Sequence, residues 1–362
     1  MSRLIRAVID SRALRSNLAA VRARAPGAHV MAVVKAHAYG HGLVPTALAL
    51  ADANAFAVAR LEEGLALRAA GITKPIVLLE GVFNSEQLFE AARHGFDLVV
   101  HDPVQIDLLE AFRGAHRFVV WLKIDTGMNR LGFRPAQFPV ALARVQAILP
   151  APLEIRVLTH LARADDRDDA SNREQIAKFN SAVGKLDYAT SISNSAGLLS
   201  GAGIQADWVR PGLALYGVSP FAATTAQDLG LQPAMTLQST VITIRHVPKG
   251  EPVGYSGAWR APRDSIIAIV GAGYGDGLPR NLPSDTPVLI GGRRATIAGR
   301  VSMDMIGVDV SSLPPLKVGD PVTLWGGGAA RRRDRPPRRH HSLRVAVRSQ
   351  PASAAGAALT SR

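Results

Sequence analysis

Residues 30–42 read VMAVVKAHAYGHG, a short apolar run that leads into a loop containing one lysine. Residues 30–34 are all apolar and mostly β-branched, which is typical of a strand buried on both faces of a sheet. Helical patterns alternate with further apolar runs after it, the runs lying at residues 56–59, 76–79, 98–100, 118–124, 155–158, 190–193 and 213–216. Eight strands at this spacing predict an α/β fold, a TIM-type (β/α)8 barrel over residues 1–230.

The second half of the chain has a different pattern, because the helical period disappears after about residue 231. Glycine and proline turns separate apolar runs at residues 235–247, 265–270, 294–297, 305–310 and 321–325. This predicts a mostly β C-terminal domain over residues 231–328, with which the first residues of the chain can pair.

The positive charge of the chain is concentrated at its end. Most of the net charge of +13 arises after residue 328, where nine arginines accompany a single acidic residue, Asp334. Residues 329–362 are low in complexity, which predicts a basic, disordered tail. A nucleic-acid binder would interleave aromatic side chains with the arginines, and this tail contains none, so nucleic acid is not expected as a partner.

Composition also restricts the location and the chemistry. No apolar run approaches the roughly 20 residues of a membrane span, and the first residues lack the apolar core of a secretory signal. We therefore expect a cytoplasmic protein without a membrane partner. The absence of cysteine excludes disulfides, thiolate catalysis and cysteine-bound metals.

Lys35 directly follows the first strand of the predicted barrel. In such barrels the carboxyl ends of the strands carry the active site. A lysine that apolar neighbours partly desolvate has a lowered pKa and can act as an amine nucleophile toward an aldehyde. Position alone favours the more common case, a strand-end lysine in a salt bridge, so the surrounding residues have to decide.

Residues 32–42 closely resemble the pyridoxal-phosphate signature of alanine racemases. The resemblance implies that Lys35 holds pyridoxal 5'-phosphate as a Schiff base and that Tyr39 binds the cofactor phosphate. His37 departs from the family, which usually has Asp or Asn at this position. His37 and His41 could be interpreted as a helical metal site, but the intervening Tyr39 and Gly40 are typical of a loop, and no metal is expected.

Further motifs of this family follow in the same order along the chain. Residues 123–133, KIDTGMNRLGF, resemble the substrate-arginine loop. The resemblance implies that Arg130 binds the cofactor phenolate and the substrate carboxylate, a geometry that suits a guanidinium group. It places Lys123 where many members carry a carbamylated lysine that positions this arginine. It also implies that His160 packs against the cofactor ring.

Two later motifs resemble the cofactor cradle of the family. The resemblance implies that hydroxyl and backbone N–H groups near helix starts hold the phosphate, with Asn194, Ser195, Gly212 and Leu213 as cofactor-binding residues. Arg210 would hydrogen-bond the pyridine nitrogen and keep it unprotonated, whereas related decarboxylases place a carboxylate there. A cation at this point weakens the ring as an electron sink and suppresses side reactions such as transamination.

The β domain would supply the second base. Racemisation removes a proton from one face of Cα and returns one on the other, so two acid-base groups must flank the substrate. The resemblance assigns the D-alanine hydrogen to Lys35 and the L-alanine hydrogen to Tyr255, which enters the active site of the partner in a homodimer. A hydrogen-bonded chain from Tyr255 through His160 to Arg210 would help the tyrosine act as a base.

Two other segments of the β domain resemble the substrate entrance. Residues 271–280, GAGYGDGLPR, follow an apolar strand as a nucleotide-binding loop would. Two prolines follow where that loop requires a helix, which argues against nucleotide binding. The resemblance implies that Tyr274 lines the entrance, that Met303 contacts substrate through its backbone, and that Asp304 shapes the pocket.

The resemblance ends after Gly328. Family members continue with a helix, a Gly-Thr-Ile-x-Tyr-Glu motif whose tyrosine binds the cofactor phosphate, and a closing strand, none of which residues 329–362 provide. Their composition fits a GC-rich gene that is read out of frame. Sequencing across the codons for Gly326 to Ala330 tests this hypothesis, and a clean frame with no alternative frame encoding the missing motif contradicts it.

The resemblance as a whole implies an isomerase that interconverts L-alanine and D-alanine, supplying D-alanine for peptidoglycan. Among other enzymes, a racemase of broader specificity or a decarboxylase of basic amino acids stays open. Arg210 argues against decarboxylation, and Tyr274 argues against large side chains. An alternative of another class is a cofactor-binding protein that the altered C-terminus has made catalytically impaired.

Overall fold

The computed structural model describes residues 4–148 and 154–326. These residues form two compact units, one comprising residues 10–234 and the other combining residues 4–9 with residues 235–326. The predicted basic tail, residues 329–362, lies outside the described residues.

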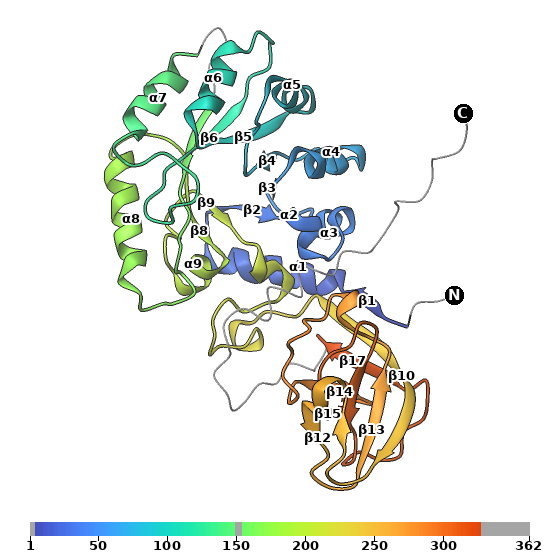
Figure 1. Cartoon of the computed structure of the whole chain (residues 1–362). Coiled ribbons are helices and arrows are strands. Elements are labelled where there is room, and N and C mark those ends of the chain that lie inside the picture. The colour runs from blue at the N-terminus through green and yellow to red at the C-terminus, as the bar shows by residue number, and fades with distance from the viewer. Residues whose placement is uncertain (1–3, 149–153, 327–362) are drawn as a thin grey trace, which may run out of the picture. The chain divides into compact units, whose positions relative to one another are not determined.

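The first unit is a closed barrel of eight parallel strands, which confirms the predicted fold class (Figure 1). Each strand pairs with the next along the chain, and the last pairs with the first. The strands are β2 (His29–Val33), β3 (Ala55–Val58), β4 (Ile76–Leu78), β5 (Phe96–Val100), β6 (Val119–Lys123), β7 (Glu154–Leu158), β8 (Thr190–Asn194) and β9 (Trp208–Arg210). Their carboxyl ends therefore meet at one end of the barrel.

The prediction of a strand at residues 213–216 is wrong. These residues form a 3-10 helix, η1 (Leu213–Tyr216), and β9 (Trp208–Arg210) completes the barrel instead. An apolar run of four residues buries its side chains equally well in one helical turn, so apolar character alone does not distinguish the two. Gly217, with φ of 72°, ends this turn in the left-handed conformation that glycine adopts readily.

Helices surround the strands of the barrel in Figure 1. They are α1 (Ser11–Arg24), α2 (Lys35–Tyr39), α3 (Leu43–Ala49), α4 (Leu61–Ala69), α5 (Ser85–His94), α6 (Pro103–Ala111), α7 (Phe138–Gln146), α8 (Ala170–Val183) and α9 (Ser195–Ser200), with a 3-10 turn η2 (Gln227–Leu229). Side chains of Asp10, Asn84, Asp102 and Asp169 accept backbone N–H bonds at four helix starts. Among the described residues, no helix has both the length and the apolar character that crossing a bilayer requires.

The second unit is built around a seven-stranded antiparallel sheet in the order β1-β10-β13-β16-β15-β14-β17, in which β17 also pairs with β10. Its strands are β1 (Arg6–Ile9), β10 (Met235–Val247), β13 (Ser265–Val270), β14 (Pro287–Ile290), β15 (Arg293–Ile297), β16 (Ile306–Asp309) and β17 (Pro321–Trp325). A hairpin is formed by β11 (Pro252–Val253) and β12 (Trp259–Arg260), which the 3-10 turn η3 (Tyr255–Gly257) connects, and a further 3-10 turn is η4 (Tyr274–Asp276). The mostly β character predicted for this region is confirmed.

The interior of the barrel contains the buried carboxyl group of Asp97. Alternate residues of a strand face the same side, so Asp97 shares the inner face of β5 with Val99, which belongs to the cluster that fills the barrel. Asp97 is 7% exposed. Burial raises its pKa to about 6, although the nearby Arg156 cation acts in the opposite direction.

We expect Asp97→Asn to raise the free energy of unfolding at neutral pH by up to about 3 kcal/mol, which corresponds to about two pKa units. The carboxyl loses its proton near pH 4 in an unfolded chain and near pH 6 in the folded one. The folded state thus binds more protons in this window, and the stability of the wild type falls as the pH rises through it. Denaturant unfolding at about pH 4 and about pH 8 checks this. The same pH dependence in both proteins would contradict it.

Candidate active site

The predicted site residues of the first unit gather at the carboxyl ends of the barrel strands. Lys35 follows β2, Lys123 ends β6, and His160 follows β7 by two residues. Asn194 ends β8, and Arg210 ends β9. This end of a barrel is where loops can vary without disturbing the core, and it is the usual place for catalytic groups.

The backbone after Lys35 makes a left-handed helical turn. Residues 36–39 all have φ between 53° and 55°, although none of them is glycine. In this turn the Ala38 N–H donates to the Val34 carbonyl at 2.8 Å, and the Gly40 N–H donates to the Ala36 carbonyl at 3.1 Å. Such a conformation costs about 1–2 kcal/mol per residue, so surrounding contacts must hold it in place.

Two side chains that sequence reasoning did not assign hold this turn. The Glu63 carboxylate accepts from the His37 N–H at 3.3 Å and from the Ala59 N–H at 2.9 Å. His41 Nδ1 lies 3.1 Å from the carbonyl oxygens of both Ala38 and Tyr39. Burial lowers the pKa of His41 to about 4, so the ring is neutral and donates from Nδ1. The sequence did signal Glu63, since an acid at the third position of a helix commonly accepts backbone N–H groups at its start.

The same turn explains the departure from the family motif at His37. Histidine, asparagine and aspartate are the residues besides glycine that most often adopt positive φ. His37 has φ of 55° and an exposed side chain. The substitution therefore keeps the backbone preference that this position requires.

Tyr39 packs into a cluster of rings that the left-handed turn creates. Its ring centroid lies 4.7 Å from that of Tyr216, and the His41 ring lies 4.6 Å from Tyr216. The Tyr216 hydroxyl donates to the Val33 carbonyl at 3.0 Å. Burial raises the pKa of Tyr39 to about 12, so its hydroxyl stays protonated and can donate. The 3-10 turn that was predicted as a strand thus positions a site residue.

The hydroxyl groups of Tyr39 and Ser195 both lie close to Gly212. The Gly212 N–H donates to Ser195 Oγ at 2.8 Å, and the Ala214 N–H donates to it at 3.2 Å. A Cβ atom at residue 212 would lie 2.5 Å from Tyr39 Oη. Leu213 is the half-buried first residue of η1. Glycine is therefore needed at residue 212 for the close approach of Tyr39.

Arg210 is a buried cation, 4% exposed, between two strand ends. Its guanidinium donates to Ser191 Oγ and to the Thr159 carbonyl, and it lies 3.3 Å from His160 Nδ1. Burial lowers the pKa of Arg210 to about 10, so the group remains protonated at neutral pH. Because the guanidinium can only donate, His160 Nδ1 accepts and the ring proton resides on Nε2.

Asn194 lies between His160 and the start of α9. Its Nδ2 donates to the Leu161 carbonyl at 3.2 Å and lies 3.4 Å from His160 Nε2, a contact rather than a hydrogen bond because both nitrogens carry protons. Its Oδ1 accepts from the Gly197 N–H. Burial, followed by the positive charges of Arg210 and other cations, lowers the pKa of His160 well below its ordinary value. His160 is therefore a neutral ring in a positively charged site.

Two lysines and Arg130 add to this positive charge. Burial lowers the pKa of Lys35, and the Arg130 cation lowers it further. Lys123 is 7% exposed, and burial together with Arg210 and Arg130 lowers its pKa to about 8. Both amines are therefore more easily deprotonated than a lysine in water.

A tight loop carries Arg130. The Asp125 carboxylate accepts from the N–H groups of Gly127 and Asn129, each at 3.0 Å. The Phe133 N–H donates to the Lys123 carbonyl at 2.9 Å and returns the chain to β6. Arg130 itself is exposed. These hydrogen bonds thus fix the loop backbone next to β6 and leave the Arg130 guanidinium accessible.

The candidate residues of the second unit lie on loops that contact one another. The Tyr274 N–H donates to the Ser302 carbonyl at 2.9 Å, and the Gly275 N–H donates to the Met303 carbonyl at 2.8 Å. A Cβ atom at residue 275 would lie 3.7 Å from Asp304 Oδ1. Tyr255 lies on η3, and Arg300 from the neighbouring loop reaches Ser256 Oγ at 3.5 Å. Tyr255, Tyr274 and Met303 are 63%, 37% and 55% exposed.

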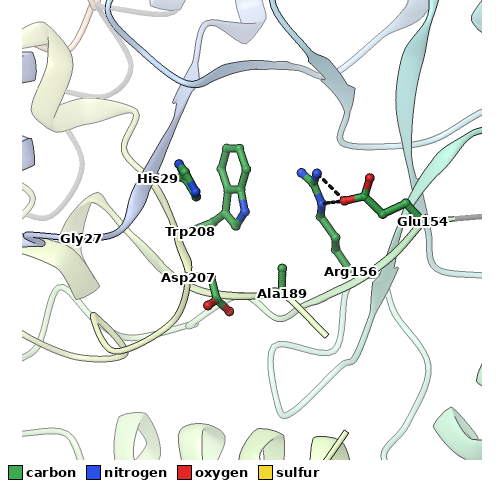
Figure 2. A pocket seen from close by; sticks show the side chains of 7 residues that line it. All are labelled: Gly27, His29, Glu154, Arg156, Ala189, Asp207 and Trp208. Atoms are coloured by element: carbon green, nitrogen blue, oxygen red, sulfur yellow. Dashed lines mark hydrogen bonds and ion pairs between the residues drawn. The ribbon is translucent and has the colours of Figure 1, made fainter. Parts of the chain in front are cut away.

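A cavity of about 300 Å3 lies at the amino-terminal end of the barrel strands, opposite the candidate site (Figure 2). Its lining includes His29, Arg156 and Trp208, from the amino-terminal parts of β2, β7 and β9. Figure 2 shows Arg156 paired with Glu154, at 2.5 Å. Because the predicted site residues lie at the carboxyl ends, this cavity is not the candidate site. Residues 4–148 and 154–326 contain no cluster of three or more side chains able to hold a metal.

Comparison with known proteins identifies similar chains for both units. The family model for the alanine racemase N-terminal domain matches residues 9–220, and the model for the alanine racemase C-terminal domain matches residues 234–336. The curated alanine racemase of Shewanella sediminis is 48% identical over 321 residues, which is 89% of this chain and 90% of the relative.

Solved structures agree with these matches. The crystal structure of the biosynthetic alanine racemase from Pseudomonas aeruginosa has a TM-score of 0.87 and 44% identity, covering 91% of this chain and 92% of that one. The alanine racemase from Bartonella henselae with covalently bound pyridoxal phosphate has a TM-score of 0.80 and 31% identity, covering 90% of this chain and 92% of that one.

Proposed function

The chain belongs to the alanine racemase family and interconverts L-alanine and D-alanine, and we propose that it does so with Lys35 and Tyr255 as its two bases. The proposal rests chiefly on Lys35, a half-buried amine at the carboxyl end of a barrel strand whose pKa is lowered by burial and by Arg130. An amine whose pKa is lowered gives up its proton more readily than a lysine in water, and it can both accept and return a proton.

The residues at the barrel end suit pyridoxal 5'-phosphate. The absence of a Cβ at Gly212 allows the close approach of the Tyr39 hydroxyl, and the Ser195 hydroxyl accepts from the Gly212 N–H. Two hydroxyl groups at one point suit a phosphate, which accepts several hydrogen bonds. Asn194, Leu213 and His160 would complete the cofactor contacts. The cofactor, when bound, withdraws electrons from the substrate and acidifies the hydrogen on Cα.

Arg210 and His160 would set the charge of this site. Arg210 stays protonated, because burial lowers its pKa only to about 10, and its N–H groups can donate to an unprotonated ring nitrogen. His160 is neutral and held by Arg210 at 3.3 Å. Arg130 is exposed at the edge of the site and would bind the substrate carboxylate, since a guanidinium matches the two oxygens of a carboxylate.

We propose a homodimer in which Tyr255 enters the site of the partner. In the single chain Tyr255 is 63% exposed, and Met303 is 55% exposed. Exposed aromatic and apolar side chains that gather on one set of loops are typical of a surface covered in an assembly. In that arrangement Tyr274 and Asp304 would line the substrate entrance. The proposed location is the cytoplasm, where D-alanine would be made for peptidoglycan.

The direct test is to mix the purified chain with pyridoxal phosphate and follow both the cofactor absorbance and the optical rotation of L-alanine. We expect a cofactor absorbance band and loss of rotation. Cofactor binding without loss of rotation would indicate a catalytically impaired cofactor-binding protein. Release of carbon dioxide from lysine or ornithine would indicate a decarboxylase.

Gly212→Ala is expected to weaken binding of pyridoxal phosphate about 10- to 100-fold. The added Cβ would lie 2.5 Å from Tyr39 Oη and displace this hydroxyl, and a hydrogen bond to a charged group contributes about 1.5–3 kcal/mol. Fluorescence titration measures the dissociation constant. Tyr39→Phe is the matched control, because it removes the hydroxyl directly. The double variant should lose little more than either single one, whereas fully additive losses would contradict the proposed contact.

We also propose that Lys123 is carbamylated. Its amine has a pKa of about 8 and is buried among cations, so the neutral form is accessible and a negative group would be favoured there. Neutral Nζ would add to carbon dioxide and lose one proton, giving a carbamate anion. Nuclear magnetic resonance of protein in 13C-bicarbonate should show a carbamate signal that Lys123→Arg lacks. The same spectrum for both proteins would contradict this proposal.

A further inference from the structure

Gln175 on α8 has no part in the proposed chemistry, yet its amide is almost fully hydrogen-bonded. The side chain is 3% exposed. Its Nε2 donates to Thr126 Oγ1 at 3.3 Å and to the His160 carbonyl at 3.2 Å. Its Oε1 accepts from the Ala162 N–H at 2.9 Å. One buried amide therefore satisfies groups from two separate loops.

The first of these loops carries Arg130. Thr126 follows Asp125, whose carboxylate shapes the loop. A Cβ atom at Gly127 would lie 3.4 Å from Gln175 Cγ, so this part of the loop packs directly on the side chain. Gln175 therefore contacts the start of the loop, at Thr126 and Gly127, through both a hydrogen bond and packing.

The second loop carries His160. Gln175 bonds the backbone on both sides of Leu161, through the His160 carbonyl and the Ala162 N–H. Thr126 Oγ1 also lies 2.8 Å from Thr159 Oγ1, which joins the two loops a second time. The Thr159 carbonyl in turn accepts from Arg210. The amide thus borders the hydrogen-bonded group that orients His160.

We propose that Gln175 is a positioning residue that fixes the loop of Arg130 relative to the strand end of His160. The inference rests on the proposed function, because it gives these two residues their roles at substrate and cofactor. Both donors of the amide are needed, since Thr126 and the His160 carbonyl each receive one. An apolar or anionic side chain of similar length cannot supply them.

Asn172 provides a matched control on the same helix. It is also a buried amide, 6% exposed, and its Nδ2 donates to the carbonyls of Arg163 and Asp166 at 3.2 and 2.9 Å. It therefore holds the loop before α8 but bonds neither Thr126 nor His160. A merely structural role for Gln175 predicts that Asn172→Leu and Gln175→Met behave alike.

The experiment compares the wild type, Gln175→Met and Asn172→Leu by alanine kinetics, thermal unfolding and hydrogen exchange. We expect both variants to unfold at lower temperature. Only Gln175→Met should lower kcat, about 10- to 100-fold, because small displacements of reacting groups cost this much, and it should also raise KM. Its exchange should speed up at residues 123–133 and 158–162, whereas Asn172→Leu should affect residues 163–169.

Two outcomes would overturn the inference. The first is that Gln175→Met has the same kcat and KM as the wild type. The second is that Gln175→Met and Asn172→Leu lose kcat equally. If Gln175→Met does not fold, Gln175→Glu takes its place. We then expect the kcat of this variant, relative to that of the wild type, to rise at low pH, because its protonated carboxyl group can again donate a hydrogen bond. An inactive wild type would refute the proposed function instead. Hydrogen exchange would then still decide whether Gln175 holds these two loops.

Discussion

Lys35→Ala is expected to reduce racemisation of alanine by about 10^4-fold or more, a larger loss than we expect from any other single substitution. The substitution removes both a proton-transfer group, which contributes about 10^2- to 10^4-fold, and the amine that would hold the cofactor covalently. The lowered pKa of this amine, caused by burial and by Arg130, favours both roles, because each requires the amine without its extra proton.

Two measurements separate these roles. Polarimetry with L-alanine gives the loss of turnover. Borohydride reduction with bound cofactor, followed by peptide mass analysis, should label the peptide that contains Lys35 in the wild type and leave Lys35→Ala unlabelled. The exposed Lys178 on α8 supplies the control, because Lys178→Ala should keep both activity and label. Labelling at Lys123 instead of Lys35 would contradict the assignment.

The strands were largely predictable because buried strands consist of short apolar runs that can be recognised in the sequence. The runs at residues 235–247, 265–270 and 321–325 match β10, β13 and β17 residue for residue. Strand β14 was missed, since Pro287 and its turn-rich flanks resemble a loop. The run at residues 213–216 was misassigned because four apolar residues carry no detectable period.

The functional residues divide in a similar way. Lys35, Tyr39 and Arg210 were predicted because they stand in motifs that resemble a known family, and the structure gathers them at one end of the barrel. Gln175 gave no signal, since its role depends on α8 passing beside two loops distant in sequence. The left-handed turn after Lys35 was not predicted either, because only His37 among residues 36–39 belongs to a residue type that favours positive φ.

Tyr255→Phe is the second large prediction, with an expected loss of about 10^2- to 10^4-fold in kcat. Phenylalanine keeps the ring and removes only the hydroxyl that would exchange a proton with Cα. Tyr255 is 63% exposed in the single chain, and a base must be screened from bulk water to act selectively on a bound substrate. We therefore expect this hydroxyl to act in the site of the partner subunit.

Mixing two inactive variants tests that expectation directly. In a symmetric dimer with shared sites, a subunit carrying Lys35→Ala and one carrying Tyr255→Phe form one site with both changes and one site with neither. After dissociation and random reassociation at equal concentration, about a quarter of all sites should be native, so activity should return to about a quarter of that of the wild type. If Tyr255 served its own subunit, each site would keep one lesion and mixing would restore nothing. A mixture of Lys35→Ala with Lys123→Ala tests complementation between two lesions in the same barrel, and it should remain well below that level, because a heterodimer of two barrel variants contains no site with an intact barrel.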